Sequence, residues 1–398
     1  MLIEFTVGNY GPFRDPVTLS MIPSALKDDT GSMMESNAVR QGILKAATVF
    51  GPNASGKSYL FEALRDLQIL IGDARPDLAT LHHVPFRLSE DSAGKPTEFG
   101  IKLLLDNIVY EYRISYVHDA IVSESLDYWP NGRRTQIFDR VDDTDRIVSE
   151  KMTKCTSYLY MSSLFNNTKC NTVLRGIFDI KILFQGRDLD VEGSFELSKK
   201  DSELRRMMLS ALDAADLGVI DFHGVDVLAQ KHYANLFRKD SVEIHTEIRL
   251  VHDFEESDVD KVGKEFPLEI ESHGTVEMFS LMGPVGYALK NGGTLIIDEF
   301  GSTLHSLLTR WIVGLFNTSE NANGAQLIVN THDLGLMDIR DLFRRDQIWF
   351  TNKDRKNGSC TLYSLSDIGG VKKNSDVCRD YLMGRYDAVP KVVGVRKL

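Results

Sequence analysis

The chain has 398 residues, of which 42% are hydrophobic and 26% charged, and this ordinary globular composition excludes a wholly disordered or fibrous protein. Its 46 Lys and Arg and 57 Asp and Glu give a formal net charge of −11, so binding of nucleic acid would need a local basic patch. No apolar run reaches the roughly 18 residues of a membrane span, and the N-terminus lacks a basic segment followed by an apolar one. We therefore expect a cytoplasmic protein with no membrane partner.

The N-terminal part of the chain predicts a hairpin, a buried strand and a helix. Apolar and polar residues alternate at 2–7 and again at 17–21, with a turn rich in Gly and Pro between them, which predicts a β-hairpin. The apolar run 43–50 is a candidate buried strand that stops at a glycine. From 58 to 71 the apolar residues recur at helical spacing.

The middle of the chain changes its periodicity twice. Residues 98–141 alternate with period two around turn residues and predict an antiparallel meander. Segments 156–183 and 202–217 have helical spacing. The apolar stripe of the second segment, which we interpret as core or subunit packing, consists of Leu204, Met208, Ala211 and Leu212.

Predicted strands resume at 219–227 and 242–251, and an acidic run follows at 253–260. We interpret the acidic run as a solvated loop, with a weak cation site as the alternative. The four cysteines form no C-x-x-C pair and have no spacing typical of a zinc site, so we expect reduced thiols. These cysteines are Cys155, Cys170, Cys360 and Cys378.

The segment after the run 43–50 fits the phosphate-binding pattern G-x-x-x-x-G-K-[ST], between a predicted strand and a predicted helix as the pattern requires. Glycines let backbone N–H groups converge on phosphate oxygens, and the helix adds its positive N-terminal end. Lys57 would bridge the β- and γ-phosphates of ATP, and the Ser58 hydroxyl would bind Mg²⁺. The predicted nucleotide-binding residues are Gly51, Pro52, Asn53, Ala54, Ser55, Gly56, Lys57 and Ser58.

A second apolar strand, at 293–300, ends in Asp298 and Glu299. Because side chains alternate along a strand, we expect these carboxylates to point to opposite faces and to have different roles. Solvent-facing acids that cap a strand are the alternative. With a phosphate loop in the same chain, we interpret Asp298 as a ligand of the Mg²⁺ site and Glu299 as the catalytic group that orients or deprotonates the attacking water.

A third apolar strand, at 325–330, is followed by His332, with a predicted helix at 303–316 between this strand and the acids. This places His332 one β-α-β step from Glu299, where its imidazole is within reach of the γ-phosphate. We interpret it as a catalytic residue that senses this phosphate; a structural strand-end histidine is the alternative.

The phosphate loop and the acids lie more than two hundred residues apart, with a strand-rich and then a helix-rich segment between them. This arrangement resembles the ABC-type ATPase heads of the SMC and RecF class, whose phosphate loop reads G-x-N-[GA]-[AS]-G-K-S. In that class a Ser-x-Gly turn that opens a helix precedes the acids. Ser272, Gly274 and Thr275, before a predicted helix at 276–289, occupy that place. The resemblance implies that they cover the ATP of a second copy, paired head to tail in a homo-oligomer.

Segments 344–350, 362–367 and 381–390 look like the C-terminal segments of the RloA/AbiL-like ATPases of bacterial abortive-infection systems, which resemble AriA of the PARIS anti-phage system. This resemblance implies an ATP-hydrolysing switch in anti-phage defence. It also implies an effector encoded nearby, commonly a Toprim-type nuclease, and a phage-derived trigger. A DNA-repair ATPase that clamps DNA, like RecF or SMC, is the alternative function, against which the net acidity argues.

The resemblance implies an α/β fold, that of an ABC-ATPase head or P-loop NTPase, with an antiparallel β subdomain and a helical insertion. We divide the chain into an N-terminal half of the head at 1–150, a helical insertion at 151–217 and a C-terminal half at 218–398. The chain departs from the class at the glutamine and in the signature, where His273 and Thr275 stand in place of the Gly and Gln of transporters. Gln68 lies inside the predicted helix and not in the position of a Mg²⁺-sensing glutamine, and the neighbouring His82 and His83 have no assigned role.

Overall fold

The computed structural model describes residues 1–26, 31–73, 79–140, 152–184, 190–215, 217–231, 241–253 and 263–390. It divides the chain into two compact units, each assembled from segments far apart in the sequence. The first unit contains Met1–Gln185, Asn291–Ser302 and Thr309–Leu398, and the second contains Gly186–Lys290 and Thr303–Leu308. The predicted division of the sequence into segments 1–150, 151–217 and 218–398 stays a prediction. The two units are compact groups in space, and each combines residues from separate parts of the sequence.

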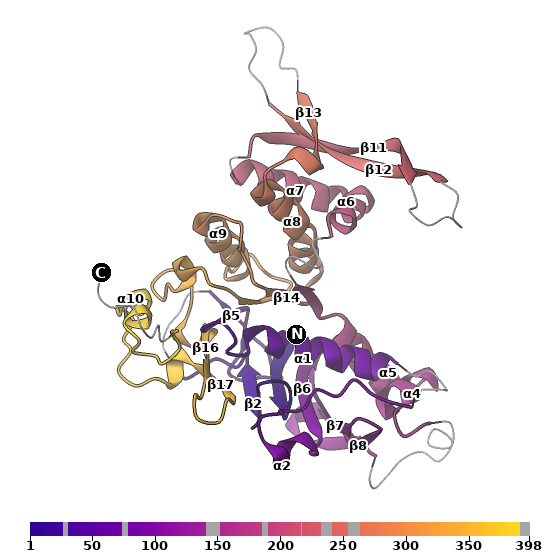
Figure 1. Ribbon diagram of the computed structural model, residues 1–398, viewed down its shortest axis with the longest axis vertical. Helices are drawn as coiled ribbons and strands as arrows, with labels where there is room; N and C mark the ends of the chain where they lie inside the picture. Colours follow the sequence, from indigo (N-terminus) through magenta and orange to yellow (C-terminus); the bar gives the residue numbers. More distant parts are fainter. Residues whose placement is uncertain are drawn as a thin grey trace. The chain divides into compact units, whose positions relative to one another are not determined.

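The first unit contains a mainly parallel sheet in the order β10-β14-β15-β5-β16-β17. Its strands are β10 (Lys181–Phe184), β14 (Thr294–Asp298), β15 (Gln326–Asn330), β5 (Ala46–Phe50), β16 (Ile348–Lys353) and β17 (Cys360–Ser364). Strands β14, β5, β16 and β17 of this sheet are labelled in Figure 1. Neighbours run parallel except β17, which pairs antiparallel with β16. Every residue of β14, β15 and β5 is buried, as expected for parallel strands covered on both faces.

A second sheet in this unit is antiparallel, in the order β2-β1-β6-β7-β8-β9. Its strands are β1 (Leu2–Gly8), β2 (Val17–Ser20), β6 (Thr97–Leu105), β7 (Ile108–Val117), β8 (Ala120–Trp129) and β9 (Thr135–Asp139). Burial alternates along β6 and β7, because one face of the sheet packs on the core. The predicted hairpin and meander are confirmed.

Helix α1 (Lys57–Gly72) contacts β1 of the antiparallel sheet and β14 of the parallel sheet. Its apolar residues, spaced as the sequence predicts, join one hydrophobic core with residues of both sheets. Helices α4 (Tyr158–Leu164) and α5 (Thr168–Phe178) belong to the same core. Outside these two sheets and helices, and outside the helices and sheet of the second unit, the α-helices and strands are β3 (Met33–Met34), β4 (Ile43–Leu44), α2 (Glu90–Ala93), α9 (Ser306–Phe316) and α10 (Val377–Leu382).

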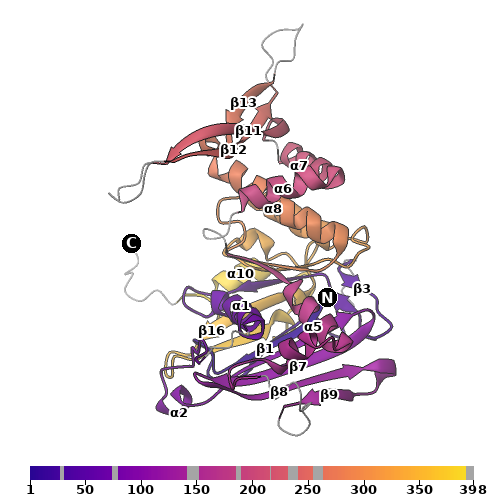
Figure 2. The same ribbon diagram turned by 90° about the vertical axis from the view of Figure 1, so that its right-hand side faces the viewer.

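The second unit packs three helices with an antiparallel sheet in the order β11-β12-β13 (Figure 2). Its elements are α6 (Val191–Lys200), α7 (Ser202–Ala214), β11 (Val219–Lys231), β12 (Ser241–His252), β13 (Lys264–Pro267) and α8 (His273–Asn291). The ring of Phe222 on β11 meets that of Phe279 on α8 edge to face, with the centroids 5.0 Å apart. The apolar stripe at 204–212 is buried, so its interpretation as packing is confirmed.

Some predicted elements are wrong in their extent. The predicted helical segment 156–183 ends in strand β10, because Lys181–Phe184 pair with β14. The predicted strand 43–50 divides at Lys45, whose Nζ donates to the carbonyl of Thr318 at 2.7 Å; β4 then pairs with β3, and β5 joins the parallel sheet. The acidic run lies outside the described residues except for Asp253.

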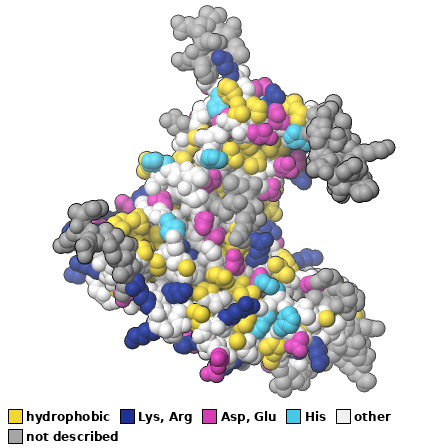
Figure 3. All heavy atoms as spheres, viewed as in Figure 1, with side chains coloured by type: hydrophobic (Ala, Val, Ile, Leu, Met, Phe, Trp, Pro, Cys, Tyr) yellow, Lys and Arg dark blue, Asp and Glu magenta, His cyan; other side chains and the backbone are white. Residues whose placement is uncertain are grey.

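No described helix is long and apolar enough to cross a membrane. On the face that Figure 3 presents, acidic and basic side chains are interspersed with apolar and uncharged ones.

The described cysteines are free thiols, three of them buried, and burial raises the pKa of Cys360 to about 11.

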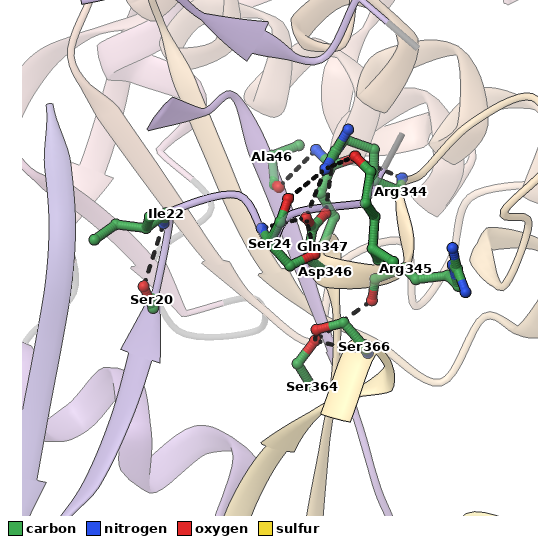
Figure 4. Close-up of polar contacts among 11 residues, drawn as sticks. Ser20, Ile22, Ser24, Ala46, Arg344, Arg345, Asp346, Gln347, Ser364 and Ser366 are labelled. Carbon is green, nitrogen blue, oxygen red and sulfur yellow. Dashed lines mark hydrogen bonds and ion pairs between the residues drawn. The ribbon is translucent and has the colours of Figure 1, made fainter. Parts of the chain in front are cut away.

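A buried ion pair holds the C-terminal segment of the first unit to its N-terminal segment (Figure 4). The Arg344 guanidinium donates to Asp346 through Nε at 3.0 Å and Nη2 at 2.8 Å, and both residues are at most 3% exposed. The free lone pairs of Asp346 accept the backbone N–H and hydroxyl of Ser24, at 2.7 and 2.8 Å. Gln347 completes the network by donating to the carbonyl of Ala46, at the start of β5.

We predict that Asp346→Ala lowers the free energy of unfolding by about 3–5 kcal/mol, because it removes the carboxylate that the buried Arg344 guanidinium contacts through two hydrogen bonds. The matched control is Asp15→Ala, which removes an aspartate from the exposed pair with Arg14 and should leave stability unchanged. Urea denaturation of both variants measures the difference. An equal, small loss in the two would contradict a structural role for the buried pair.

Candidate functional site

The predicted site residues of the first unit lie where parallel strands end. Strands β14, β15, β5 and β16 are neighbours in this order and run in one direction. Asp298 is the last residue of β14, Gly51 follows β5, and His332 lies two residues beyond the end of β15. The carboxyl ends of parallel strands share one edge of the sheet, so residues far apart in the chain meet there.

The phosphate loop leaves the first turn of α1 open to an anion. Gly56 caps this helix with φ 97°, and no side chain caps its first turn. Ala54 is also left-handed, with φ 60°. A helix N-terminus carries unpaired N–H donors and partial positive charge, which are the features that bind phosphate. The residues present therefore fit the phosphates of a nucleotide.

Lys57 is buried in this loop, with its side chain directed back toward the loop backbone. Its ammonium donates to the carbonyl of Gly51 at 2.8 Å and to that of Pro52 at 3.1 Å. Burial lowers the pKa of Lys57 to about 8, against the opposing effect of the Asp298 and Glu299 carboxylates. A bound polyanion would supply the negative charge that this desolvated ammonium lacks.

Asn330 holds the acidic strand end. Its Nδ2 donates to Oδ1 of Asp298, and its Oδ1 accepts the backbone N–H of Glu299 at 2.7 Å. Its carbonyl accepts the N–H of Phe300 at 2.9 Å. The amide of one residue thus fixes both the buried Asp298 carboxylate and the turn that follows it.

The expected strand alternation of Asp298 and Glu299 is wrong. The strand ends at Asp298, and Glu299 has φ 56°, a left-handed conformation that is uncommon outside glycine. Asp298 is buried and Glu299 is exposed. The two carboxylates are separated by this turn of the backbone, and strained residues of this kind gather at functional sites.

The pKa of His332 depends on burial and on the charges of Lys57 and Glu299. Burial lowers its pKa, the Lys57 ammonium lowers it further, and the Glu299 carboxylate raises it. The imidazole is therefore neutral at pH 7 and can both donate and accept a hydrogen bond. Thr331 anchors the preceding position by donating to the carbonyl of Phe300 at 2.8 Å.

Two candidate oxygen ligands for a Mg²⁺ ion come from the start of α1 and from the end of β14. Among the described residues no group of three His, Cys, Asp or Glu side chains forms a metal site. The Ser58 hydroxyl and the Asp298 carboxylate are nevertheless the oxygen donors that Mg²⁺ prefers, since it commonly takes one or two protein ligands and completes its shell with water and phosphate. The donor set fits Mg²⁺ bound together with a nucleotide.

The predicted signature residues belong to the second unit. The hydroxyl of Ser272 accepts the N–H of Thr275 at 3.1 Å, so it caps the first turn of α8. A Cβ at Gly274 would lie 3.4 Å from the Thr303 carbonyl oxygen and 3.8 Å from Ser272 Oγ. Ser272, Gly274 and Thr275 form the expected turn at the start of α8.

Sequence reasoning missed Asn330, although it ends the apolar strand next to the acidic one, and a polar residue at that position is the signal. Gln68 donates to the carbonyls of Ile177 and Ile180, at 2.8 and 2.9 Å, so it serves to join α1 and α5. His82 forms an ion pair with Asp66 of α1 at 3.0 Å when protonated.

Three solved SMC heads resemble this chain at 12–14% identity. The head bound to the C-terminal winged-helix domain of ScpA has a TM-score of 0.45 and 14% identity, and the alignment covers 91% of this chain and 97% of that one. The head from Thermotoga maritima has 0.43 and 12%, covering 91% and 98%. The head with an extended coiled coil bound to the C-terminal domain of ScpA, from Pyrococcus furiosus, has 0.39 and 14%, covering 91% and 96%.

Among curated protein sequences, none is similar enough to count as a match. A family model described as an AAA domain, putative AbiEii toxin of a type IV toxin–antitoxin system, matches residues 47–338. This range is more than half of the chain and includes the phosphate loop, the signature turn, the acids and His332. The predicted α/β fold of a P-loop ATPase, with its antiparallel β subdomain, is confirmed. The chain therefore belongs to the family of AAA domains described as putative AbiEii toxins of type IV toxin–antitoxin systems.

Proposed function

We propose that this chain binds ATP with Mg²⁺ and hydrolyses it to ADP and phosphate, as the switch of a bacterial anti-phage system. The observation that carries the proposal is that the phosphate loop, Asp298 and His332 follow three neighbouring parallel strands and so lie at one edge of the sheet. In keeping with this arrangement, the Asp298 and Glu299 carboxylates oppose the lowering of the Lys57 pKa by burial, and Lys57 and Glu299 act on the pKa of His332 in opposite directions. A phosphate loop, an acid pair and a neutral imidazole within mutual influence are the parts that phosphoryl transfer to water needs.

Each residue has a distinct part in the proposed reaction. The loop 51–58 and Lys57 bind the phosphates, and Ser58 and Asp298 would hold Mg²⁺, which when bound neutralises phosphate charge. Glu299 is exposed at the end of a fixed turn, and it takes a proton from the attacking water. His332 donates a hydrogen bond to the γ-phosphate while that phosphate is present.

The proposed active site is shared between two copies of the chain. Ser272, Gly274 and Thr275 form a turn at the start of the long helix α8, and such a turn favours an anion. In our proposal it covers the γ-phosphate held by the loop of a second copy, paired head to tail. ATP would then set the shape of the homo-oligomer.

Two findings support the proposed role in anti-phage defence. The family description names a putative toxin of a type IV toxin–antitoxin system, and the tail segments resemble ATPases of abortive-infection systems. We propose that the switch controls an effector, a Toprim-type nuclease encoded nearby, in response to a phage-derived trigger. Recovery of this nuclease with the tagged protein tests the assignment; purification of the chain alone, with and without ATP, would count against it.

Two substitutions separate nucleotide binding from turnover. Lys57→Ala should weaken ATP binding by on the order of 2–5 kcal/mol, because it removes the buried cation of the loop. Glu299→Gln keeps the size of the side chain and should bind ATP normally, while hydrolysis falls by roughly 10²-fold or more through loss of the base. Calorimetry with Mg·ATP and a phosphate-release assay check both. Wild-type affinity in the first variant, or wild-type turnover in the second, would reject the assigned role.

The shared site is tested with Gly274→Asp. A Cβ at this position makes only ordinary contacts, at 3.4 Å or more, and in the proposed pairing the carboxylate comes to the phosphate held by the other copy. The variant should lose hydrolysis but keep binding to its own loop, whereas Gly274→Asn, of equal size and no charge, should retain activity. Mixing Gly274→Asp with Lys57→Ala should restore part of the hydrolysis, because one site of a mixed dimer is intact. Mixed oligomers no more active than either parent would contradict sharing.

A further inference from the structure

A threonine outside the phosphate-loop pattern touches the loop from the neighbouring strand. Thr351 follows the last residue of β16 that pairs with β5, Phe350, which lies opposite Phe50. Its side chain is fully buried. Its Oγ1 lies 2.6 Å from Oγ of Ser55, a buried residue of the loop.

The direction of these hydrogen bonds follows from counting protons. The hydroxyl of Ser55 has one proton, and it lies 2.7 Å from the carbonyl of Pro52, which can only accept. The Thr351 hydroxyl has one further acceptor, the carbonyl of Phe50, but that oxygen is more distant, at 3.4 Å. The shorter contacts are made when Ser55 donates to Pro52 and Thr351 donates to Ser55. The result is a directed chain from Thr351 to Ser55 to Pro52, which runs from the sheet into the loop.

The same threonine explains why residue 51 is a glycine. A Cβ on Gly51 would lie 2.3 Å from Oγ1 of Thr351, 2.6 Å from its carbonyl oxygen and 2.7 Å from Oγ of Ser55. No side chain fits at these distances. The loop thus leaves β5 in direct contact with β16, whose position limits the path that the loop can take.

The end of β16 is itself held from the opposite side. The ring of Phe350 stacks on those of Tyr381 and Tyr386, with centroids 5.8 and 5.3 Å apart, and contacts Phe50 at 6.4 Å. These aromatic residues are buried. The strand residue before Thr351 is therefore fixed by aromatic packing, and the Thr351 hydroxyl contacts the loop at a fixed position.

We propose that Thr351 is a positioning residue for the nucleotide: it holds Ser55 and, through Ser55, the Pro52 carbonyl, so that the loop is shaped for phosphate before ATP arrives. The inference rests on the proposed function, since it assumes that the loop binds ATP. Preorganisation of this kind lowers the ordering cost of binding. Once ATP is bound, the phosphates themselves fix the loop, so the effect falls on binding more than on turnover.

The test replaces the hydroxyl with a methyl group of the same shape. Thr351→Val should weaken Mg·ATP binding about 3- to 10-fold, the size expected for one buried hydrogen bond. It should raise KM by the same factor and leave kcat within about twofold. Thr351→Ser keeps the hydroxyl and should restore the affinity. Titration calorimetry and steady-state hydrolysis provide these values.

The matched control is Thr48→Val on β5. Thr48 is also fully buried, but its hydroxyl is among the buried polar groups of the described residues that have no hydrogen-bond partner. Its removal should leave nucleotide affinity unchanged. Thermal unfolding of the nucleotide-free variants separates a loss of stability from a loss of affinity.

Ser55→Ala gives an independent measure, because it removes the acceptor of the proposed bond. It should weaken ATP binding at least as much as Thr351→Val, and the double variant should bind no more weakly than Ser55→Ala alone. Additive losses, or a Thr351→Val variant that unfolds earlier yet binds ATP with wild-type affinity, would overturn the positioning role while leaving the proposed function intact. A wild-type chain that does not bind ATP would overturn both.

Discussion

Parallel pairing of β14, β15, β5 and β16 is the constraint on which the site depends. It sets the ends of four strands side by side, although their residues come from both ends of the chain. The order matters: β15 lies between the acidic strand and the strand of the phosphate loop, so Asn330 can hold Asp298 while His332 senses the Lys57 ammonium. Parallel strands are buried on both faces, and their polar groups are free for chemistry only at such ends.

The electrostatic state of this edge follows from its burial. Lys57 is desolvated and donates to two carbonyls of its own loop, which are weaker partners than an anion. Asp298 is buried and is held by the neutral amide of Asn330. The fold thus gives the Lys57 ammonium and the Asp298 carboxylate neutral hydrogen-bond partners at the same edge of the sheet. A nucleotide with Mg²⁺ would bring opposite charge to both, which makes binding of the pair more favourable than binding of either alone.

The sequence predicts those parts of the site that are determined by residues close together in the chain. The loop 51–58, α1 and the strands before Asp298 and His332 follow from apolar runs and from one pattern, and the structure places them as expected. The split of 43–50 at Lys45 and the strand at the end of 156–183 were missed, because both depend on partners far away in the chain. The turn at Glu299 and the contact of Thr351 with Ser55 depend on neighbouring strands, for which no local pattern exists.

The central claim is that one sheet edge of the first unit binds the phosphates of ATP. Backbone hydrogen exchange of the Glu299→Gln chain, compared with and without Mg·ATP, tests it most directly because it locates the contact without relying on turnover. The account predicts slower exchange for the amides of residues 53–58, and no such change in a chain that also carries Lys57→Ala. Unchanged exchange in this loop, with protection elsewhere in the chain, would contradict the account.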